Sequence, residues 1–475
     1  MYLCGIDVGT TTIKSSVFDE RGRLLKTYSE GYPLITSPRG GVEQDAQSWY
    51  DLSAATMKKC MSELPATDKA YLSISAQGGS VVPVDENGEP LALAATWMDG
   101  RGEEFITELC TKYSRDEFFK KTGKRPGKTS GLTKIKLFEH LNPAAYLTTL
   151  EYVNMRLTGR AVTDPTSAEM VALYDINDGG WQREILDVCG IDINKLPEIA
   201  PSGEIIGKLT PEAVSDSGLP EETYVVNGAH DQYIAAAGAN VLSHGDVLLS
   251  TGTAWVVFGS AEKRNLNSSL SIGPHVIPDM FGVFSSVPTG GAALDWVRGK
   301  ILSDVDFETL DGEVMERIGK NKNLMCVPRF SGQEAVISGL ELSTNGYDIA
   351  LAVMEGVVFE VRTIFERFMA DGYLPAKDIS VFRDGKKLLG MVGGAVKGKP
   401  WQTLVGAILG DTAIYRDSNM TLIGTAVFAG VAAGIWKNYA EGSDAICDPV
   451  PLTSGAELRA FYDEKFESYK NRLKK

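Results

Sequence analysis

The chain has 475 residues, of which 43% are hydrophobic and 23% are charged. This length exceeds what a single hydrophobic core usually supports, so two domains are expected. The 62 acidic residues outnumber the 47 basic ones and give a net charge of −15. That balance argues against nucleic acid or an anionic membrane as the main partner, although one anionic nucleotide needs only local N–H groups and a cation.

Cysteine usage and hydropathy bear on the compartment. The six cysteines are scattered singly, without a CxxC pair or a Cys/His cluster. A zinc site is therefore not expected, and a reduced cytoplasmic setting is the simplest interpretation. A strand-like run begins at Tyr2, so a signal peptide is not expected. No apolar stretch is long and uninterrupted enough to span a bilayer.

The N-terminal region predicts an antiparallel meander. Residues 2–30 form an apolar strand, a Gly-Thr turn within DVGTTTIK, a second strand, a turn and a third strand. Helical spacing follows at 45–64, and AYLSISA at 70–76 predicts a buried strand. A further strand, YVVNGA at 224–229, leads into the small-residue run DQYIAAAGANV, which predicts a helix.

The segment GDVLLSTGTAWVVFG at 245–259 repeats the pattern of the N-terminus, with an apolar strand, a Gly-Thr turn and another apolar strand. Two halves that each begin with such a hairpin indicate a duplication with a boundary close to Ser243. We therefore expect one domain at 1–242 and a second at 243–475.

Four more elements are expected in the second half. Residues 347–372 predict a long helix that ends at Gly372, and 377–385 predict a short strand. Residues 401–410 predict another helix. The run at 421–439 predicts a helix rich in small residues and suited to close packing.

Two stretches come near a P-loop. GKRPGKT at 123–129 has only three residues between its glycines. GGAVKGKP at 393–400 has the GxxxxGK spacing but ends in Pro, where Ser or Thr should hold magnesium. Neither clearly follows a strand and opens a helix. A P-loop enzyme is therefore the weaker hypothesis, and the first stretch is interpreted as a basic loop.

The Gly-Thr hairpins offer another way to bind phosphate. In DVGTTTIK, Gly9 permits a tight turn, and the N–H groups and hydroxyls of Thr10–Thr12 can donate to phosphate oxygens. Asp7 can hold Mg²⁺ through water, and Lys14 adds a positive charge. Taken alone, the stretch is equally well explained as an ordinary hairpin. The second copy at Gly252-Thr253 favours phosphate binding.

In combination, these motifs resemble those of the FGGY carbohydrate kinases of the actin-like ATPase superfamily, nearly from end to end. DVGTTTIK is similar to the first phosphate motif of that family and STGTAW to the second. VEQDAQSWY, TWMDGR and HDQYIAAAG match further family elements, and the last of these contains the catalytic Asp. TGGAALDWVRG resembles the segment that borders the nucleotide, and GGAVKGKPWQTLVGAILG resembles the adenosine motif.

The resemblance implies an α/β fold of two duplicated actin-like (ribonuclease H-like) domains with the active site in the cleft between them. The N-terminal domain would bind the sugar and carry the first phosphate hairpin, and the C-terminal domain would bind the nucleotide. ATP and Mg²⁺ are the implied cofactors, and a small sugar or polyol is the implied substrate. A homodimer is a common assembly in the family and stays open for this chain.

The resemblance also assigns individual residues. The nucleotide-binding set is Thr10, Thr11, Thr12, Lys14, Gly252, Thr253, Gly291, Asp295, Gly394 and Ala395. The substrate set is Gln77, Gly78, Gly79, Trp97 and Gln232, and the implied magnesium residue is Asp7. The implied catalytic base is Asp231, which would accept the proton of the attacking hydroxyl.

Each assignment has a plainer alternative. Asp231 precedes a small-residue helix and could simply cap it. Trp97 could stack on the carbon backbone of a polyol or be buried in a core. His230 is interpreted as a structural neighbour, and Asp99 with Arg101 as an ion pair that shapes the site.

The loop SAQGGSV at 75–81 limits how far the substrate can be named. In xylulose kinases this loop reads Gln-Met-His-Gly, and in glycerol kinases it carries an Arg-Glu pair. Gly78 and Gly79 replace those side chains here. A xylulose-like pentulose is the first candidate, and glycerol, rhamnulose and other keto-sugars remain open. A non-catalytic nucleotide switch on the actin-like fold is the competing hypothesis.

Overall fold

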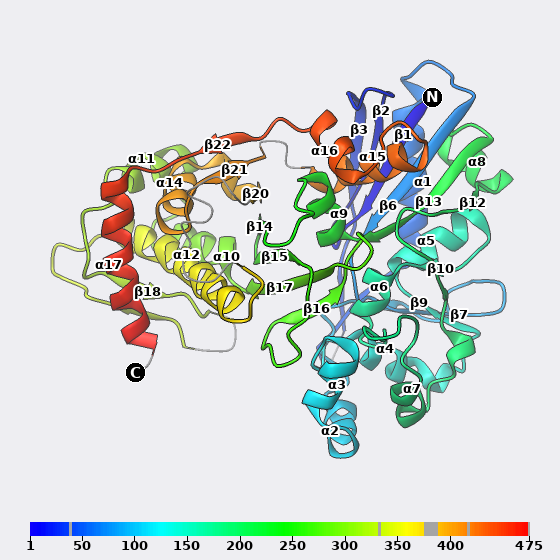
Figure 1. Cartoon of the computed structure of the whole chain (residues 1–475), viewed down its shortest axis with the longest axis horizontal. Helices are drawn as coiled ribbons and strands as arrows, with labels where there is room; N and C mark the ends of the chain where they lie inside the picture. The colour runs from blue at the N-terminus through cyan, green and yellow to red at the C-terminus, as the bar shows by residue number, and fades with distance from the viewer. Residues whose placement is uncertain (38–39, 331–333, 375–387, 416–418, 474–475) are drawn as a thin grey trace. The chain divides into compact units, whose positions relative to one another are not determined.

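The computed structural model describes residues 1–37, 40–330, 334–374, 388–415 and 419–473, and Figure 1 shows the course of the chain. Contacts divide it into two compact units. The first unit contains Met1–Leu242, Ser271–Gly282 and Met420–Cys447, and the second contains the rest. The expected division of the sequence into domains at 1–242 and 243–475 stays a prediction.

A mixed six-stranded sheet forms the centre of the first unit. Its strands lie in the order β12-β13-β6-β1-β2-β3. β1 pairs antiparallel with β2 and parallel with β6, and β6 pairs parallel with β13. Every residue of β1 is buried, as expected for a strand covered on both faces. The bounds are β1 (Tyr2–Val8), β2 (Thr12–Phe18), β3 (Leu24–Gly31), β6 (Lys69–Ala76), β12 (Ile205–Lys208) and β13 (Glu222–His230).

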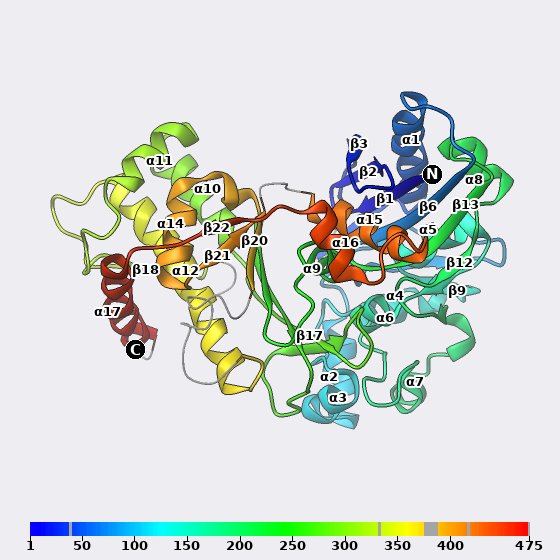
Figure 2. The same ribbon diagram turned by 45° about the horizontal axis from the view of Figure 1, so that its top comes forward.

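Helices cover both faces of this sheet. Ser15 hydrogen-bonds with Thr56 of α1 (Gln47–Ser62), so α1 packs on the face to which Ser15 points. The neighbouring Ser16 points to the opposite face and pairs with Gly5 across the strands. A Cβ at Gly5 would collide with Thr425 of α15 (Met420–Ala432), so α15 packs closely on that second face. Figures 1 and 2 both show α15 against β1 and β6.

Some of the shorter elements form a second hydrophobic cluster around Phe118, Leu132 and Leu173. Shorter elements inside and outside that cluster complete the first unit. They are β4 (Ile35–Ser37), β5 (Gly41–Gln44), β7 (Val82–Val84), β8 (Ala94–Ala95), α2 (Glu103–Lys112), α3 (Arg115–Thr122), α4 (Gly131–Phe138), η2 (Glu139–Leu141), β9 (Ala145–Leu147), α5 (Thr149–Thr158), β10 (Val162–Thr163), α6 (Pro165–Met170), α7 (Arg183–Cys189), η3 (Ile193–Lys195), β11 (Glu198–Ile199), α8 (Pro211–Ser217), α9 (Asp231–Gly238), β16 (Ser271–Pro274) and α16 (Tyr439–Ile446).

The second unit is built on a similar sheet. Its strands lie in the order β17-β15-β14-β20-β21-β22. β14 pairs antiparallel with β15 and parallel with β20, which pairs parallel with β21. The bounds are β14 (Val247–Thr251), β15 (Trp255–Ala261), β17 (Phe281–Val287), β20 (Leu389–Gly393), β21 (Thr412–Ile414) and β22 (Val450–Leu452).

Helices and one small hairpin complete the second unit. The longest helix, α12, is buried along most of its length. The elements are α10 (Gly290–Lys300), α11 (Phe307–Met315), β18 (Met325–Val327), β19 (Val336–Ser338), α12 (Gly346–Ala370), η4 (Gly394–Lys397), α14 (Lys399–Ile408) and α17 (Ala456–Leu473).

The two central sheets have matching topologies. β1, β2 and β6 of the first sheet correspond to β14, β15 and β20 of the second in order and in direction. The next strand is parallel in both sheets, and the strand after it is antiparallel in both. The expected duplication and the α/β fold class are therefore confirmed.

Several of the helices and strands expected from the sequence are present in the structure. The N-terminal meander, the strands at 70–76 and 224–229 and the long helix before Gly372 are confirmed. The helix expected over 421–439 is shorter, because α15 ends at Ala432 and Gly434 adopts a positive φ. The strand expected at 377–385 lies outside the described residues.

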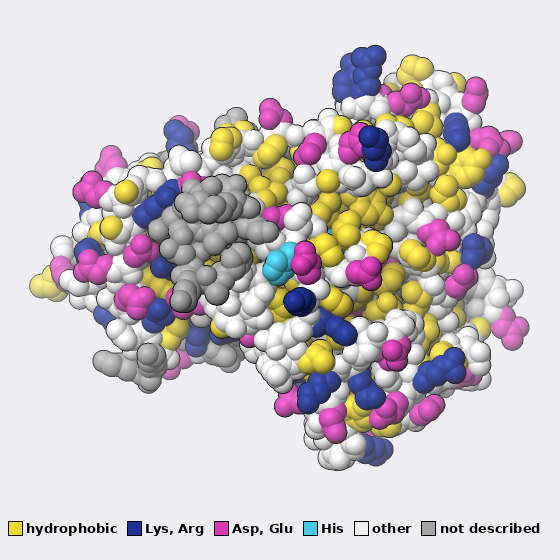
Figure 3. All heavy atoms as spheres, in the orientation of Figure 1, with side chains coloured by type: hydrophobic (Ala, Val, Ile, Leu, Met, Phe, Trp, Pro, Cys, Tyr) yellow, Lys and Arg dark blue, Asp and Glu magenta, His cyan; other side chains and the backbone are white. Residues whose placement is uncertain are grey.

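Polarity on the surface is mixed. In Figure 3 acidic and basic side chains are interspersed over the visible face, so the excess negative charge is not gathered there into a single block. Among the described residues, no helix combines the length and the apolar character needed to cross a bilayer.

Candidate active site

Polar side chains gather where the parallel strands of the first sheet end. The register pairs Asp7 of β1 with Ser75 of β6, and Ala76 of β6 with His230 of β13. The carboxyl ends of neighbouring parallel strands meet at one edge, where ligands bind in open α/β sheets. Asp231 follows His230 directly, so this edge brings the predicted base close to the predicted magnesium residue.

Asp231 is the first residue of α9, and the N-cap position before it is occupied by His230. The His230 side chain makes no capping hydrogen bond, and Asp231 lies inside the helix, so the structure does not support the alternative that Asp231 is the N-cap. The side chain is 29% exposed, and its Oδ1 is buried without a hydrogen-bond partner among the described residues. Burial raises the pKa of Asp231 to about 6, against opposing hydrogen bonds from Gln232. A carboxylate in this state is well suited to accept a proton.

Asp7 is buried and held by two hydroxyl groups. Its Oδ1 accepts a hydrogen bond of 2.8 Å from Ser75, and its Oδ2 accepts one of 2.9 Å from Thr421 at the start of α15. Burial, together with the nearby charge of Asp231, raises the pKa of Asp7, while Lys14 opposes this shift. Two neighbouring carboxylates with raised pKa values would be stabilised by a bound cation.

The first Gly-Thr hairpin has its carbonyl groups occupied by the protein. Gly9 O accepts from the Tyr32 hydroxyl, Thr10 O from the Gln44 amide and Thr11 O from the Tyr32 backbone N–H. In the part of the chain that the structure describes, the N–H groups of Thr10 and Thr11 have no acceptor. Such N–H groups at a tight turn suit an anionic oxygen.

Trp97 lies at this hairpin and is 44% exposed, so the alternative that it is buried in a core is wrong. Its indole Nε1 donates a hydrogen bond of 3.0 Å to Thr10 Oγ1, and its backbone N–H donates to Ser80 Oγ. The side chain is therefore partly accessible from solvent, while its Nε1 is held at the predicted phosphate hairpin.

The glycine pair has a structural explanation beside the predicted substrate role. A Cβ at Gly78 would collide with the His230 ring and lie 2.6 Å from Met170 Cγ. Gly79 has a φ of +78°, a conformation that favours glycine. The neighbouring Gln77 is buried. Its Nε2 donates to Gln44, and its Oε1 has no partner among the described residues.

The predicted ion pair between Asp99 and Arg101 is confirmed. The Arg101 guanidinium donates to both carboxylate oxygens of the fully buried Asp99 and to Glu43 at 2.6 Å. Asp99 also accepts from the Val42 backbone N–H. This network fixes the turn that presents Trp97.

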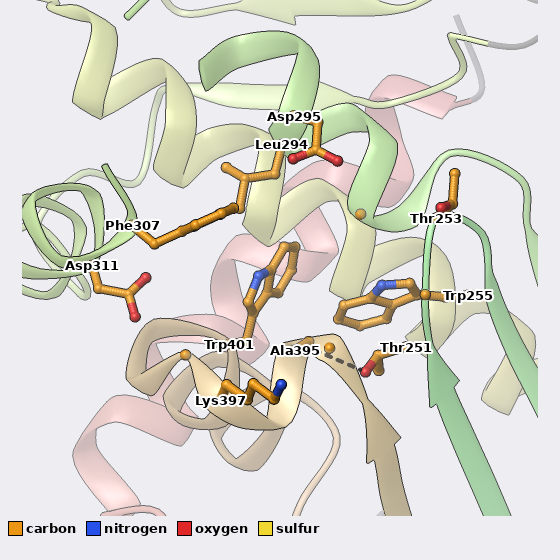
Figure 4. Close-up of a pocket in the computed structure, with 14 residues that line it drawn as sticks. Thr251, Thr253, Trp255, Leu294, Asp295, Phe307, Asp311, Ala395, Lys397 and Trp401 are labelled. Atoms are coloured by element: carbon orange, nitrogen blue, oxygen red, sulfur yellow. Dashed lines mark hydrogen bonds between the residues drawn. The ribbon is translucent and has the colours of Figure 1, made fainter. Parts of the chain in front are cut away.

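The second unit contains a pocket of about 550 Å³ at the end of β14 (Figure 4). This volume lies in the range typical of small-molecule sites. The lining residues come from the second Gly-Thr hairpin, α10, α11, η4 and α14, and they are Thr251, Gly252, Thr253, Trp255, Gly291, Leu294, Asp295, Phe307, Asp311, Gly394, Ala395, Lys397, Gly398 and Trp401. The structure thus brings together six residues of the predicted nucleotide set, whereas Thr10–Thr12 and Lys14 lie in the first unit.

The second hairpin is fixed against the start of α10. Gly252 O accepts from the Gly291 N–H at 3.0 Å, and Thr253 O accepts from the Ala292 N–H at 3.1 Å. Thr251 Oγ1 accepts from the Ala395 N–H, the contact drawn in Figure 4. As in the first hairpin, carbonyl groups of the turn are taken by the protein.

Aromatic side chains form the apolar walls of the pocket. The rings of Trp255 and Trp401 are 4.7 Å apart, and Phe307 is 54% exposed across from them (Figure 4). Sequence reasoning assigned no role to these three residues. Trp255 and Trp401 lie within or beside the motifs STGTAW and GGAVKGKPWQTLVGAILG, but nothing in the sequence around Phe307 points to the pocket.

Comparisons with known proteins agree with this architecture. Residues 2–238 match the model of the N-terminal domain of the FGGY family of carbohydrate kinases, and residues 247–433 match the model of its C-terminal domain. The chain belongs to the FGGY family of carbohydrate kinases. It is therefore a phosphotransferase that acts on a hydroxyl group of a carbohydrate or polyol.

Relatives of this FGGY kinase carry different substrate names. A gluconokinase of Bacillus subtilis is 26% identical over 390 residues, which cover 77% of this chain and 76% of that protein. The structure of a ligand-bound xylulose kinase from Lactobacillus acidophilus has a TM-score of 0.90 at 21% identity. The match covers 99% of this chain and 97% of the xylulose kinase chain. The structure of Plasmodium falciparum glycerol kinase with ADP has a TM-score of 0.87 at 20% identity. The match covers 99% of this chain and 98% of the glycerol kinase chain.

Proposed function

We propose that this FGGY kinase transfers the γ-phosphoryl group of ATP to a hydroxyl of a small ketose or polyol, with Asp231 as the general base. The observation that carries the proposal is the position of Asp231, whose buried Oδ1 has no partner among the described residues at the carboxyl edge of the first sheet. Phosphoryl transfer needs a group that accepts the proton of the attacking hydroxyl, together with positioning and charge stabilisation.

The second-unit pocket is the proposed ATP site. Its aromatic and apolar walls suit a nucleobase, and Gly394 and Ala395 at its floor allow close approach of the ligand to the backbone. The N–H groups of Thr10 and Thr11 and the hydroxyls of Thr10–Thr12 and Thr253 are proposed to donate to phosphate oxygens, and Lys14 to add a positive charge. The ADP in the name of the glycerol kinase neighbour supports a nucleotide in this family fold.

Magnesium fits the residues present at the first sheet edge. Asp7 offers hard carboxylate oxygens that keep free lone pairs beside the hydrogen bonds from Ser75 and Thr421. The described residues contain no group of three or more His, Cys, Asp or Glu side chains that could hold a metal directly, and Mg²⁺ usually binds through few carboxylates, water and substrate phosphates. When bound, Mg²⁺ would neutralise charge on the phosphates.

Trp97, Gln77 and Gln232 are the proposed groups that orient the acceptor. The exposed ring of Trp97 can pack against a carbon backbone, and Gln77 Oε1 is an unused acceptor. A xylulose-like pentulose is the first candidate, in keeping with the near-complete overlap with a xylulose kinase fold. Glycerol, gluconate and other keto-sugars are the alternatives that the related enzymes name.

The competing hypothesis of a non-catalytic nucleotide switch is set aside, because the matching family is one of enzymes.

The test is ADP release from purified protein over a panel of ketoses, polyols and aldonates, with Asp231→Asn as the variant. We expect at least one acceptor to stimulate ADP release, and Asp231→Asn to lower kcat by about 10²–10⁴-fold with ATP affinity nearly unchanged. Asp51→Asn, at an exposed position of α1, is the matched control and should keep full activity. Near-normal turnover by Asp231→Asn would refute the role of Asp231, and a well-folded protein with no active acceptor would refute the proposed substrate class.

A further inference from the structure

The imidazole of His230 occupies the space beside Gly78. A Cβ at Gly78 would collide with His230 Cδ2 and lie only 2.8 Å from Nε2. The ring is thus packed against the loop at 75–81 and can hold this position only because residue 78 has no side chain. The space that a side chain at residue 78 would fill is occupied by the His230 side chain, from the end of β13.

Contacts with α6 and α9 fix the position of His230. Its backbone N–H donates to Thr166 Oγ1 at 3.0 Å, and that hydroxyl in turn donates to Asp164 at 2.7 Å. Tyr233 packs edge-to-face against the ring, with centroids 6.0 Å apart. The side chain is only 8% exposed, so it has little freedom to move away from the sheet edge.

The ring is neutral and carries one donor. Burial, with the nearby charge of Lys124, lowers the pKa of His230 to about 3. Its Nδ1 is buried and has no hydrogen-bond partner among the described residues. Because a buried N–H without an acceptor is disfavoured, we assign the proton to Nε2, which lies 3.4 Å from Asp231 Oδ1.

Two cations near His230 and the Trp97 turn, Lys124 and Arg101, are already paired. Lys124 forms an ion pair of 3.3 Å with the buried Glu169, and Arg101 is engaged by Asp99 and Glu43. His230 therefore offers a hydrogen bond without a positive charge. A neutral N–H suits a hydroxyl or keto oxygen better than a carboxylate, which would also meet the charge of Asp231.

We propose that His230 Nε2 donates a hydrogen bond to the acceptor substrate, at the oxygen on the carbon next to the phosphorylated hydroxyl. This rests on the proposed role of Asp231 and adds a residue that determines specificity. The two polar groups, 3.4 Å apart, match two oxygens on neighbouring carbons: one loses its proton to Asp231, and the other accepts from His230. The site thus selects an acceptor that carries uncharged oxygens on two neighbouring carbons.

The test compares matched acceptors that differ only in this neighbouring oxygen. Glycerol is paired with 1,3-propanediol, and D-xylulose with 4-deoxy-D-xylulose, with terminal phosphorylation verified by NMR of the product. In the unmodified enzyme, removal of the oxygen should lower kcat/KM by roughly 10–100-fold, as expected when a buried donor loses its partner. In His230→Ala the same removal should change kcat/KM by less than about threefold, and KM for ATP should stay constant.

Two further variants separate contact from structure. The fall in kcat/KM on removal of the neighbouring oxygen is called the deoxy penalty. Gly78→Ala should displace the ring and reduce the deoxy penalty, as His230→Ala does. Gly127→Ala, where a Cβ meets no atom within 4 Å, should leave the deoxy penalty unchanged. His230→Gln retains a donor and should keep part of the penalty. His140→Ala removes an exposed histidine and is the second control.

The outcomes distinguish the two proposals. An equal deoxy penalty in the unmodified enzyme and in His230→Ala would overturn the contact from His230 while leaving the kinase assignment intact. Because the penalty is a ratio measured within each variant, partial loss of folded protein does not affect it. Absence of turnover with every acceptor in the unmodified enzyme would overturn the proposed function and this inference together.

Discussion

At the scale of single residues, the environment of Asp231 determines how activity should depend on pH. Burial raises its pKa from 3.8 to about 6. Between these values the folded state binds more protons than the unfolded state, so the contribution of Asp231 to stability increases as pH falls through this window. A loss of activity in the same range therefore cannot be explained by unfolding driven by Asp231.

We expect kcat/KM for the acceptor to fall as pH decreases through about 6, because only the ionised carboxylate accepts a proton. A pH profile of ADP release, with circular dichroism at each pH, measures this. Glu169, whose burial raises its pKa to about 7, titrates nearby. The fall in kcat/KM near pH 6 should persist in Glu169→Gln. A value of kcat/KM that stays constant between pH 5 and 7 would argue against Asp231 as the base.

At the scale of elements, the crossing of α9 and α15 positions the start of α9. A Cβ at Gly424 would collide with the Ile234 carbonyl, and a Cβ at Gly238 would lie 2.9 Å from the Gly424 backbone nitrogen. The small residues that predicted close packing from sequence are therefore in contact at this crossing. Any separation of the two helices would shift Asp231, the first residue of α9.

Gly424→Ala should destabilise the first unit by roughly 1–3 kcal/mol, because the added methyl forces the helices apart. It should also lower kcat more than it changes KM for ATP. Chemical denaturation and steady-state kinetics measure the two effects. Gly312→Ala in α11, where a Cβ meets no atom within 4 Å, is the control and should preserve both properties. Unchanged activity in Gly424→Ala would show that the crossing does not position the base.

At the scale of the whole molecule, the two duplicated sheets carry different groups at corresponding hairpins. The hairpin of the first unit lies beside Asp7, Trp97 and Asp231, and the hairpin of the second unit lines an apolar pocket. We propose that the second unit holds the nucleobase end of ATP and the first unit holds the acceptor, while the Gly-Thr turn of each unit contributes to phosphate binding. The cleft expected from sequence, the homodimer and the cytoplasmic location stay predictions.

Gly291→Ala tests this division of roles. The added Cβ would lie 2.6 Å from the Gly252 carbonyl and should displace the second hairpin. We expect KM for ATP to rise at least about tenfold while KM for the acceptor changes little, because the acceptor groups belong to the other unit. Initial-rate kinetics with each substrate varied in turn measure this. A parallel rise in both KM values would contradict separate sites.

The sequence alone determined the duplication, the strand-turn-strand hairpins and the family, because these depend on local hydrophobic patterns and on turn residues that only a few conformations accept. It also singled out Asp231 and the glycine pair at 78–79. Only the tertiary structure showed what surrounds Gly78. The space at Gly78 is filled by His230 from a strand more than a hundred residues away, and the pocket wall at Phe307 comes from a helix with no motif. Such contacts arise from packing between distant segments, which local pattern does not encode.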